Sequence, residues 1–295
     1  MATSTSPHTH PDRVVASPKV WTSLITNLAY LPGLLTLEAS LREVGSQYPL
    51  VALYTDSFPA EGHSALDARN IPKQHVAYLL PAVEKKFDPS DSRFYDCWSK
   101  LTPFSLVQYS RVVQLDSDMM VRRNMDELMD LPLDGPELQG QGPRVFAASH
   151  ACVCNPLNKP HYPPDWIPAN CAFTTQHSSP ELAQREVYDR ITALLASPDS
   201  TSSMDFSDQS LLSDLFPGRW VALPYIYNAL RPMRWRGVHD AIWRDEEVKN
   251  VHFLLNPKPW DETAEMMGQR GEREEINAWW WEVTERRRGW RGRGG

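Results

Sequence analysis

Cysteines and long apolar runs are scarce in this sequence. Its 295 residues contain four cysteines, at positions 97, 152, 154 and 171, with no CxxC spacing. That number is too small for a disulfide framework, and Cys152 and Cys154 by themselves do not make a zinc knuckle. The sequence also lacks an amino-terminal signal pattern and any apolar run of about 18 residues. We therefore expect reduced thiols in a soluble, cytoplasmic protein with no membrane partner.

Basic charge is also in short supply. Lys and Arg total 30 against 37 Asp and Glu, a net charge of −7, so the molecule as a whole is not built to cover a polyanion. The 41% hydrophobic and 23% charged residues exclude a wholly disordered or fibrous chain. The sequence contains neither a P-loop nor an internal repeat. After these exclusions the sequence is that of a globular protein, and its length fits one large α/β domain.

Short apolar runs alternate with amphipathic stretches along most of the chain. This alternation predicts an α/β fold with a mostly parallel sheet that is covered on both faces. The expected strands are Val20–Ile25, Pro49–Tyr54, His75–Leu80, Arg111–Leu115, Val145–Ala148 and Val251–Leu255. The expected helices are the leucine stripe from Leu34 to Leu41, which ends at Gly45, and the segments Glu181–Leu195 and Phe206–Phe216.

Composition divides the chain into three parts. Residues 1–18 are rich in Ser, Thr, Pro and His and predict a disordered leader. Residues 19–262 carry the α/β pattern and predict one domain. Residues 263–295 form a charged and aromatic extension, which ends in an Arg/Gly tail from Arg286 onward.

The sharpest chemical feature is Asp116-Ser117-Asp118, directly after the apolar strand expected at Arg111–Leu115. Ligands bind at the carboxyl ends of parallel strands. Two carboxylates two residues apart can both turn toward one hard cation, and that cation can neutralise a diphosphate. By itself the pattern is equally typical of an Asp-rich turn at a sheet edge.

Five separated motifs resemble glycosyltransferase family 8, which includes glycogenin and galactinol synthase. The segment Ser99–Asp118 carries the family's Lys, Gln-Tyr-Ser and DxD in its spacing. The other motifs are LITNLAY at 24–30, MDFSDQSLL at 204–212, LPYIYNAL at 223–230 and VHFLLNPKPW at 251–260. The resemblance spans about residues 20–260. It implies a GT-A-type fold, a single Rossmann-like domain with the DxD motif at a strand end.

The resemblance implies a metal-dependent, retaining enzyme that moves a hexose from a UDP-sugar. Asp116, Asp118 and His252 would bind Mn²⁺ or another divalent cation, and a carboxylate and imidazole set suits Mn²⁺ better than Ca²⁺. Lys258 would hold the diphosphate as it leaves. Without the resemblance, His252 could simply be a histidine packed in the core, and Lys258 a solvent-exposed lysine in a loop. No carboxylate nucleophile is evident, so front-face attack assisted by the leaving diphosphate is expected.

The same resemblance implies the remaining site residues. Lys100, Asp208 and Gln209 are the catalytic candidates, and Tyr30 would stack on uracil. Tyr30 could instead cap a helix start, and Asp205 and Asp208 could cap a helix amino terminus. The predicted nucleotide-sugar set is Leu24, Thr26, Asn27, Tyr30, Arg93, Lys100, Asp116, Ser117, Asp118, Asn170, Cys171, Asp205, Asp208, Gln209, His252, Leu255 and Lys258. Within it, Arg93 rests on a spacing that departs from glycogenin.

Three positions depart from the family pattern. Ala172, Ser210 and Leu255 stand where the family has glycine. The first two exchange one small residue for another. Leu255 can still donate its backbone N–H to a phosphate, provided that its backbone angles are allowed without glycine. These departures bear on the choice of sugar more than on the reaction.

The acceptor is expected to be an external hydroxyl, of a polyol or a glycan. Glycogenin modifies its own tyrosine between the last two motifs, but the interval from Ala229 to Val251 contains no Tyr. It contains Trp235 and Trp243, which lack a hydroxyl and are expected to line an acceptor groove. Galactinol synthase shows that the family accepts small polyols. The sequence leaves open whether the protein forms a homodimer.

Two competing functions deserve comparison. Haloacid-dehalogenase phosphatases also carry a strand followed by DxD, but their motif has Thr or Val two residues after the second Asp, where this sequence has Met120. A non-catalytic protein of the same fold could bind RNA through its Arg/Gly tail. The intact DSD motif, His252 and Lys258 argue against a catalytically inactive protein of this fold. Nucleic acid is not expected as a partner.

Overall fold

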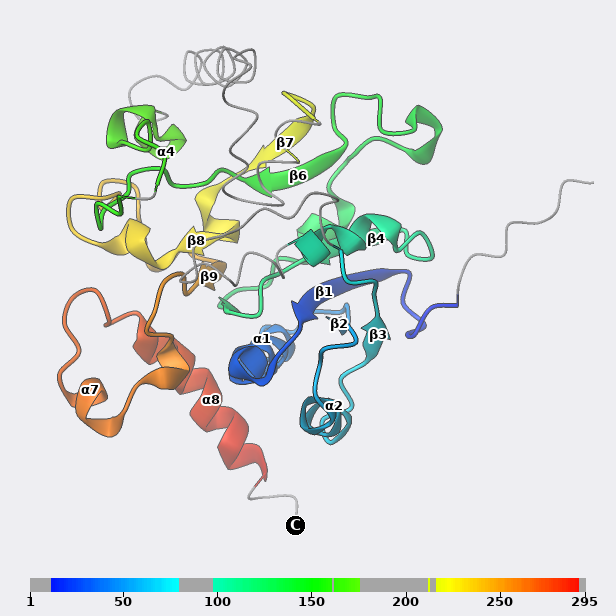
Figure 1. The fold of residues 1–295 in the computed structure, drawn as a ribbon, viewed down its shortest axis with the longest axis horizontal. Coiled ribbons are helices and arrows are strands. Elements are labelled where there is room, and N and C mark those ends of the chain that lie inside the picture. The colour runs from blue at the N-terminus through cyan, green and yellow to red at the C-terminus, as the bar shows by residue number, and fades with distance from the viewer. Residues whose placement is uncertain (1–11, 80–97, 161, 176–211, 213–215, 292–295) are drawn as a thin grey trace, which may run out of the picture.

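A four-stranded parallel sheet forms the centre of the molecule (Figure 1). The computed structural model describes residues 12–79, 98–160, 162–175, 212 and 216–291. The strand order is β3-β2-β1-β4, and all three pairings are parallel. The strands are β1 (Lys19–Ile25), β2 (Leu50–Tyr54), β3 (Lys73–His75) and β4 (Arg111–Gln114). The predicted parallel sheet is confirmed.

Both faces of this sheet are covered. Successive side chains of a strand point to opposite faces, so β1 contributes apolar residues to each of them. Trp21 and Ile25 of β1 face the helices α1 (Leu31–Glu43) and α2 (Ala60–Asp67). Val20 and Leu24 face the opposite way. They pack with Leu106 and Tyr109, which follow the 3₁₀ segment η3 (Trp98–Ser105).

Two smaller sheets complete the fold. In the first, β5 (Met119–Val121) pairs antiparallel with β9 (Asn250–His252), which pairs parallel with β8 (Ala229–Leu230). In the second, β6 (Phe146–Ser149) pairs parallel with β7 (Trp220–Leu223).

Two expected strands differ from the observed ones. A strand was expected at His75–Leu80, but β3 covers Lys73–His75, so the two share only His75. Pairing continues only as far as the Val76 amide, and the Leu79 amide donates instead to the Ser99 hydroxyl. The strand expected at Val251–Leu255 ends at His252, because Leu255 turns the chain with φ of 70°.

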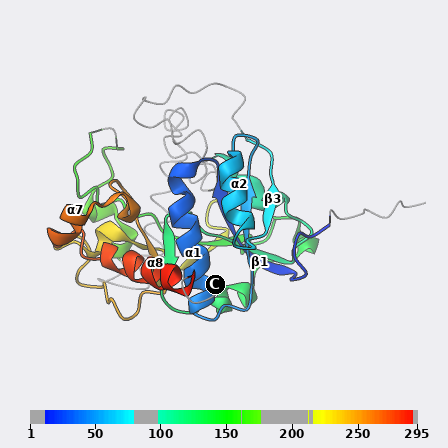
Figure 2. The ribbon, with the colours of Figure 1, turned by 90° about the horizontal axis from the view of Figure 1, so that it is seen from below.

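The carboxyl-terminal helix α8 (Asn277–Arg291) crosses α1 (Figure 2). The hydroxyls of Thr36 and Thr284 lie 3.0 Å apart in this contact, and Trp280 is buried in the same core cluster as β9 residues. Part of the Arg/Gly-rich segment that begins at Arg286 is helical, since α8 continues to Arg291. The boundary at residue 262 stays a prediction.

Short elements connect these layers. Among the described residues, two further α-helices are α4 (Ala172–Thr175) and α7 (Ala264–Gly268). The 3₁₀ segments are η1 (Leu28–Tyr30), η3 (Trp98–Ser105), η4 (Asp126–Asp130), η5 (Pro136–Leu138), η6 (Pro168–Asn170), η7 (Tyr225–Tyr227), η8 (Arg231–Arg234) and η9 (Pro259–Asp261). Several have proline in their first turn, where the missing N–H costs nothing.

Some expectations lie outside the described residues. They include the helix expected at Glu181–Leu195 and nearly all of that expected at Phe206–Phe216. Within the described part of the chain, no helix combines the length and apolar character needed to span a membrane.

Candidate functional site

The candidate site lies where the strand order of the central sheet reverses. From β1 the chain adds β2 and β3 on one side and β4 on the other, and open α/β sheets bind ligands at such a point. Asp116, Ser117 and Asp118 connect β4 to β5 there. The Ser117 hydroxyl donates to the Leu24 carbonyl at 2.9 Å, which ties this connection to the end of β1.

The pairing of β5 with β9 brings His252 to the two carboxylates. Met119 lies opposite His252 in the register, and the Phe253 amide donates to the Asp118 carbonyl at 2.9 Å. As a result, His252 Nε2 is 3.1 Å from Asp118 Oδ1 and 3.6 Å from Asp116 Oδ2. Residues more than 130 positions apart thus form one cluster of oxygen and nitrogen donors.

Asn228 orients the imidazole of His252. Its side-chain oxygen lies 2.9 Å from His252 Nδ1, so Nδ1–H donates and Nε2 faces the carboxylates. Metal-binding histidines usually donate their second N–H in this way. The sequence contained Asn228 within a recognised motif, but nothing local assigned it a role.

The donor set fits a divalent cation. Two carboxylates and an imidazole nitrogen meet within 4.8 Å, and such mixed ligands suit Mn²⁺. Asp118 and His252 are 7% and 6% exposed, while Asp116 is more accessible and leaves a side for a ligand.

Two lysines approach the same carboxylates. Lys258 Nζ is 2.6 Å from Asp118 Oδ2 and donates to the Phe253 carbonyl at 2.8 Å. Lys100 Nζ, from η3, is 2.8 Å from Asp116 Oδ2. Lys258 is 5% exposed, which excludes the solvated loop lysine.

The pKa of Asp118 reflects this surrounding charge. Burial alone would raise it, but His252 and Lys258 outweigh burial and lower the pKa of Asp118 far below its usual range. This shift favours the ionised carboxylate, which is the form that binds a metal.

The turn after β9 is held by a buried arginine. Arg231 is 4% exposed and donates to the carbonyls of Leu255 and Pro257 at 3.2 and 3.1 Å. Burial lowers the pKa of this guanidinium, although nearby acids oppose the shift. Leu255 adopts φ of 70°, the left-handed conformation that glycine provides at lower cost. Sequence reasoning did not find Arg231.

The first predicted nucleotide loop packs directly on the DSD connection. Gly33 lies so close that a Cβ there would be 2.2 Å from the Ser117 carbonyl oxygen and 2.7 Å from the Trp260 ring. Tyr30 meets Trp260 edge to face at 5.9 Å, and Lys258 Nζ lies 5.6 Å from the Tyr30 ring centre. Tyr30 stands at the N-cap of α1 without a capping side-chain bond.

The predicted residues fall into three groups. The residues just described converge around the switch point. Asn170 donates to the Asp165 carbonyl at 2.7 Å, while the fully buried Cys171 thiol faces His239. Arg93, Asp205, Asp208 and Gln209 lie outside the described residues. All the proposed binding roles stay predictions.

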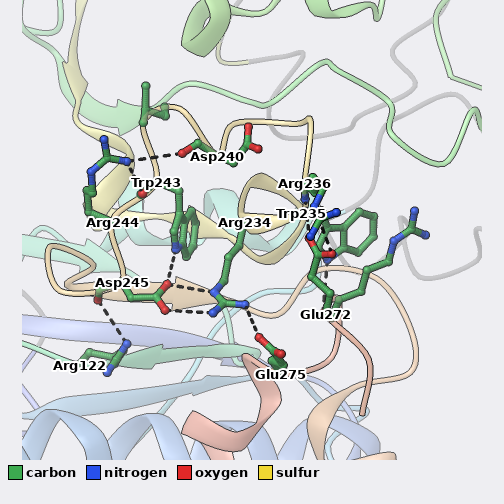
Figure 3. A network of polar contacts seen from close by, with 12 residues as sticks. Arg122, Arg234, Trp235, Arg236, Asp240, Trp243, Arg244, Asp245, Glu272 and Glu275 are labelled. Carbon is green, nitrogen blue, oxygen red and sulfur yellow. Dashed lines mark hydrogen bonds and ion pairs between the residues drawn. The ribbon is translucent and has the colours of Figure 1, made fainter. Parts of the chain in front are cut away.

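The two tryptophans expected to line an acceptor groove are largely buried in the structure. Trp235 and Trp243 are each 7% exposed. Trp243 Nε1 donates to Asp245 at 2.6 Å, and Arg234 holds the same carboxylate with two hydrogen bonds (Figure 3). This network lines a shallow depression that shares no residue with the metal-ligand cluster. Trp243 borders this depression, although both indoles are largely buried, so an acceptor groove walled by them stays a prediction.

Residues 22–264 match the sequence profile of the family "Glycosyl transferase family 8". The chain belongs to this family. It is a glycosyltransferase, and the resemblance carried by the five motifs is confirmed.

Curated relatives of this glycosyltransferase include galactinol synthases. Galactinol synthase 1 of Solanum lycopersicum is 27% identical over 267 residues, which cover 88% of this chain and 79% of the relative. Galactinol synthase 1 of Ajuga reptans is 28% identical over 281 residues, covering 89% and 79%.

Solved structures support the fold. The galactosyltransferase LgtC, in complex with donor and acceptor sugar analogues, aligns with 90% of this chain and 95% of its own. The TM-score is 0.50 and the identity 14%, so the likeness shows the GT-A fold alone.

Proposed function

We propose that this glycosyltransferase moves a hexose from a UDP-sugar to an external hydroxyl, with a divalent cation and with retention of configuration. The observation that carries the proposal is the convergence of Asp116, Asp118 and His252 at the switch point, with Lys258 and Lys100 beside them. A bound divalent cation would neutralise the diphosphate of the donor.

The residues themselves divide the remaining work. Two carboxylates and two ammonium groups cancel in charge, so the cluster gains its positive charge only when a cation is added. Metal and UDP should therefore bind synergistically. We expect Lys258, which pairs with Asp118, to stabilise negative charge on the departing diphosphate. Asn228 would keep His252 Nε2 aimed at the carboxylates.

The acceptor proposal follows from the relatives. The names of these relatives identify galactinol as their product, which favours a small polyol as the acceptor class. The absence of tyrosine between Ala229 and Val251 agrees with an external acceptor. The family match does not favour the phosphatase alternative, and the helical course through Arg291 does not favour a loose RNA-binding tail.

The deciding experiment is a donor panel of UDP-Glc, UDP-Gal and UDP-GlcNAc, each with Mn²⁺ and with polyol acceptors. We expect UDP release from one donor, lost with EDTA and restored by Mn²⁺. Absence of both binding and turnover across the panel would overturn the proposal.

Two variants locate the activity. Asp118→Asn should abolish Mn²⁺-dependent UDP binding, measured by calorimetry, while circular dichroism stays unchanged. The matched control is Asp130→Asn, at the other end of the sheet, where Asp130 pairs with Lys19. If both variants bind UDP with unchanged metal dependence, the cation lies elsewhere.

A further inference from the structure

A second group of metal-ligating side chains lies apart from the site described above. Cys152, Cys154, Cys171 and His239 offer three sulfurs and one ring nitrogen, all within 4.8 Å of one another. None of these residues belongs to the Asp116, Asp118 and His252 cluster. In the sequence, only Cys152 and Cys154 are close enough to be considered together as metal ligands, and Cys171 was expected at the nucleotide-sugar site instead.

The three sulfurs converge on a single atom. His239 Nε2 lies 3.3 Å from Cys152 Sγ, 3.3 Å from Cys154 Sγ and 3.4 Å from Cys171 Sγ. One ring nitrogen has either one proton or one lone pair, so it can satisfy only one sulfur with a well-directed hydrogen bond. Three equal distances are better explained by a shared central partner.

The spacing matches a tetrahedral zinc centre. With Zn–S of about 2.3 Å and Zn–N of about 2.0 Å, tetrahedral angles set each sulfur–nitrogen separation at roughly 3.5 Å. The observed separations are 3.3–3.4 Å. Three cysteines and one histidine are a standard ligand set of structural zinc sites. We propose that Cys152, Cys154, Cys171 and His239 bind one zinc ion.

The surroundings suit a closed structural site. Cys171 is 0%, His239 4% and Cys154 8% exposed, so little room remains for a water or substrate ligand. The ring of Phe173 meets the imidazole edge to face at 5.7 Å, which adds an apolar wall. Four protein ligands and restricted solvent access indicate a structural role for the metal.

The zinc ion would fix an irregular part of the fold. Among the described residues of 150–167 no helix or strand forms, and irregular connections of this length are uncommon without another constraint. The ion would join this connection to the start of α4 and to the loop between η8 and β9, which lie on one side of the molecule (Figure 1). It would also fix Asn170, which precedes Cys171 and is predicted to contact the sugar.

Zinc binding requires the thiolate forms, so the cysteine protons are released to solvent on binding. The first measurement is the zinc content of the full-length protein by elemental analysis, after supplementation with Zn²⁺ and extensive dialysis. We expect about one zinc per chain.

The second measurement distinguishes this site from the carboxylate cluster. Co²⁺ in place of zinc should give thiolate-to-cobalt charge-transfer absorption in the near ultraviolet. Asp116, Asp118 and His252 cannot produce that signal, since they supply no sulfur. The unmodified chain is sufficient for this test, so it does not depend on whether a variant folds.

Variants then assign the ligands. Cys154→Ser and His239→Asn should each weaken or abolish the cobalt absorption and zinc retention. His75→Asn is the matched control, because His75 pairs with Asp56 at the exposed edge of the central sheet. Loss confined to the first two variants supports the proposal.

Three results would overturn it. They are no retained zinc after supplementation, no thiolate-to-cobalt absorption in the unmodified chain, or full zinc retention by the Cys154→Ser, His239→Asn double variant. A disulfide among the three cysteines, found by mass spectrometry after alkylation without reduction, would also exclude the site.

Discussion

Replacing Gly33 with alanine tests whether the first nucleotide loop and the DSD connection are positioned by direct contact. Gly33 lies in the first turn of α1. The added Cβ would be 2.2 Å from the Ser117 carbonyl oxygen and 2.7–2.8 Å from two atoms of the Trp260 ring. The oxygen belongs to the backbone between the two predicted metal ligands, so it cannot rotate away.

The expected loss of stability is the difference between two effects. Forcing an extra methyl group into a packed contact costs about 1–3 kcal/mol. Alanine is a better helix former than glycine and returns up to about 1 kcal/mol. Because the contact is with backbone, we take the upper part of the first range and expect a net loss of about 2 kcal/mol. Displacement of Ser117 should also weaken Mn²⁺-dependent UDP binding.

The assay is denaturant unfolding of the full chain, followed by calorimetry with UDP and Mn²⁺. Gly268→Ala is the matched control, since it makes the same exchange in α7, where a Cβ would meet no atom within 4 Å. That variant should unfold with little change or a small gain in stability. Equal stability and equal UDP affinity for Gly33→Ala and the unmodified protein would refute the contact reasoning.

Further substitutions probe single contacts around the site. Asn228→Ala should weaken metal binding about 10- to 100-fold by releasing His252, measured by Mn²⁺ titration of UDP binding; unchanged affinity would contradict the orienting role. The free energy of unfolding of Leu255→Gly should exceed that of Leu255→Ala by about 1 kcal/mol, because only glycine relieves the positive φ. A less stable glycine variant would contradict this. Burial raises the pKa of Glu262, but three hydrogen-bonding partners lower it overall, so its stabilisation exists above the ordinary glutamate pKa and disappears as the pH falls. Glu262→Gln should therefore cost about 2 kcal/mol at pH 7 and progressively less below about pH 4, measured by unfolding at several pH values; a deficit independent of pH would refute the charge. Finally, incubation with UDP-sugar and Mn²⁺ should leave the intact mass of the protein unchanged; a ladder of hexose additions would show a self-acceptor.

Local patterns predicted the central sheet well. The apolar runs at β1, β2 and β4 were found almost to the residue, since buried parallel strands are continuously hydrophobic. The errors came at strand ends. β3 and β9 are shorter than expected, because a hydrogen bond to Ser99 and the positive φ of Leu255 interrupt pairing, and neither is visible in hydrophobic spacing.

The sequence by itself determined the family, the DSD motif at a strand end and the identity of its metal-ligand candidates, because each depends on short patterns in fixed order. Tertiary structure decided which distant residues meet. The register of β5 with β9 places His252 on Asp118, and packing of the later loops gathers Cys171 and His239 around Cys154. Such contacts depend on the pairing of segments far apart in the chain, and no local periodicity encodes that pairing. For the same reason the composition suggested sugar-binding tryptophans, while the fold buries them.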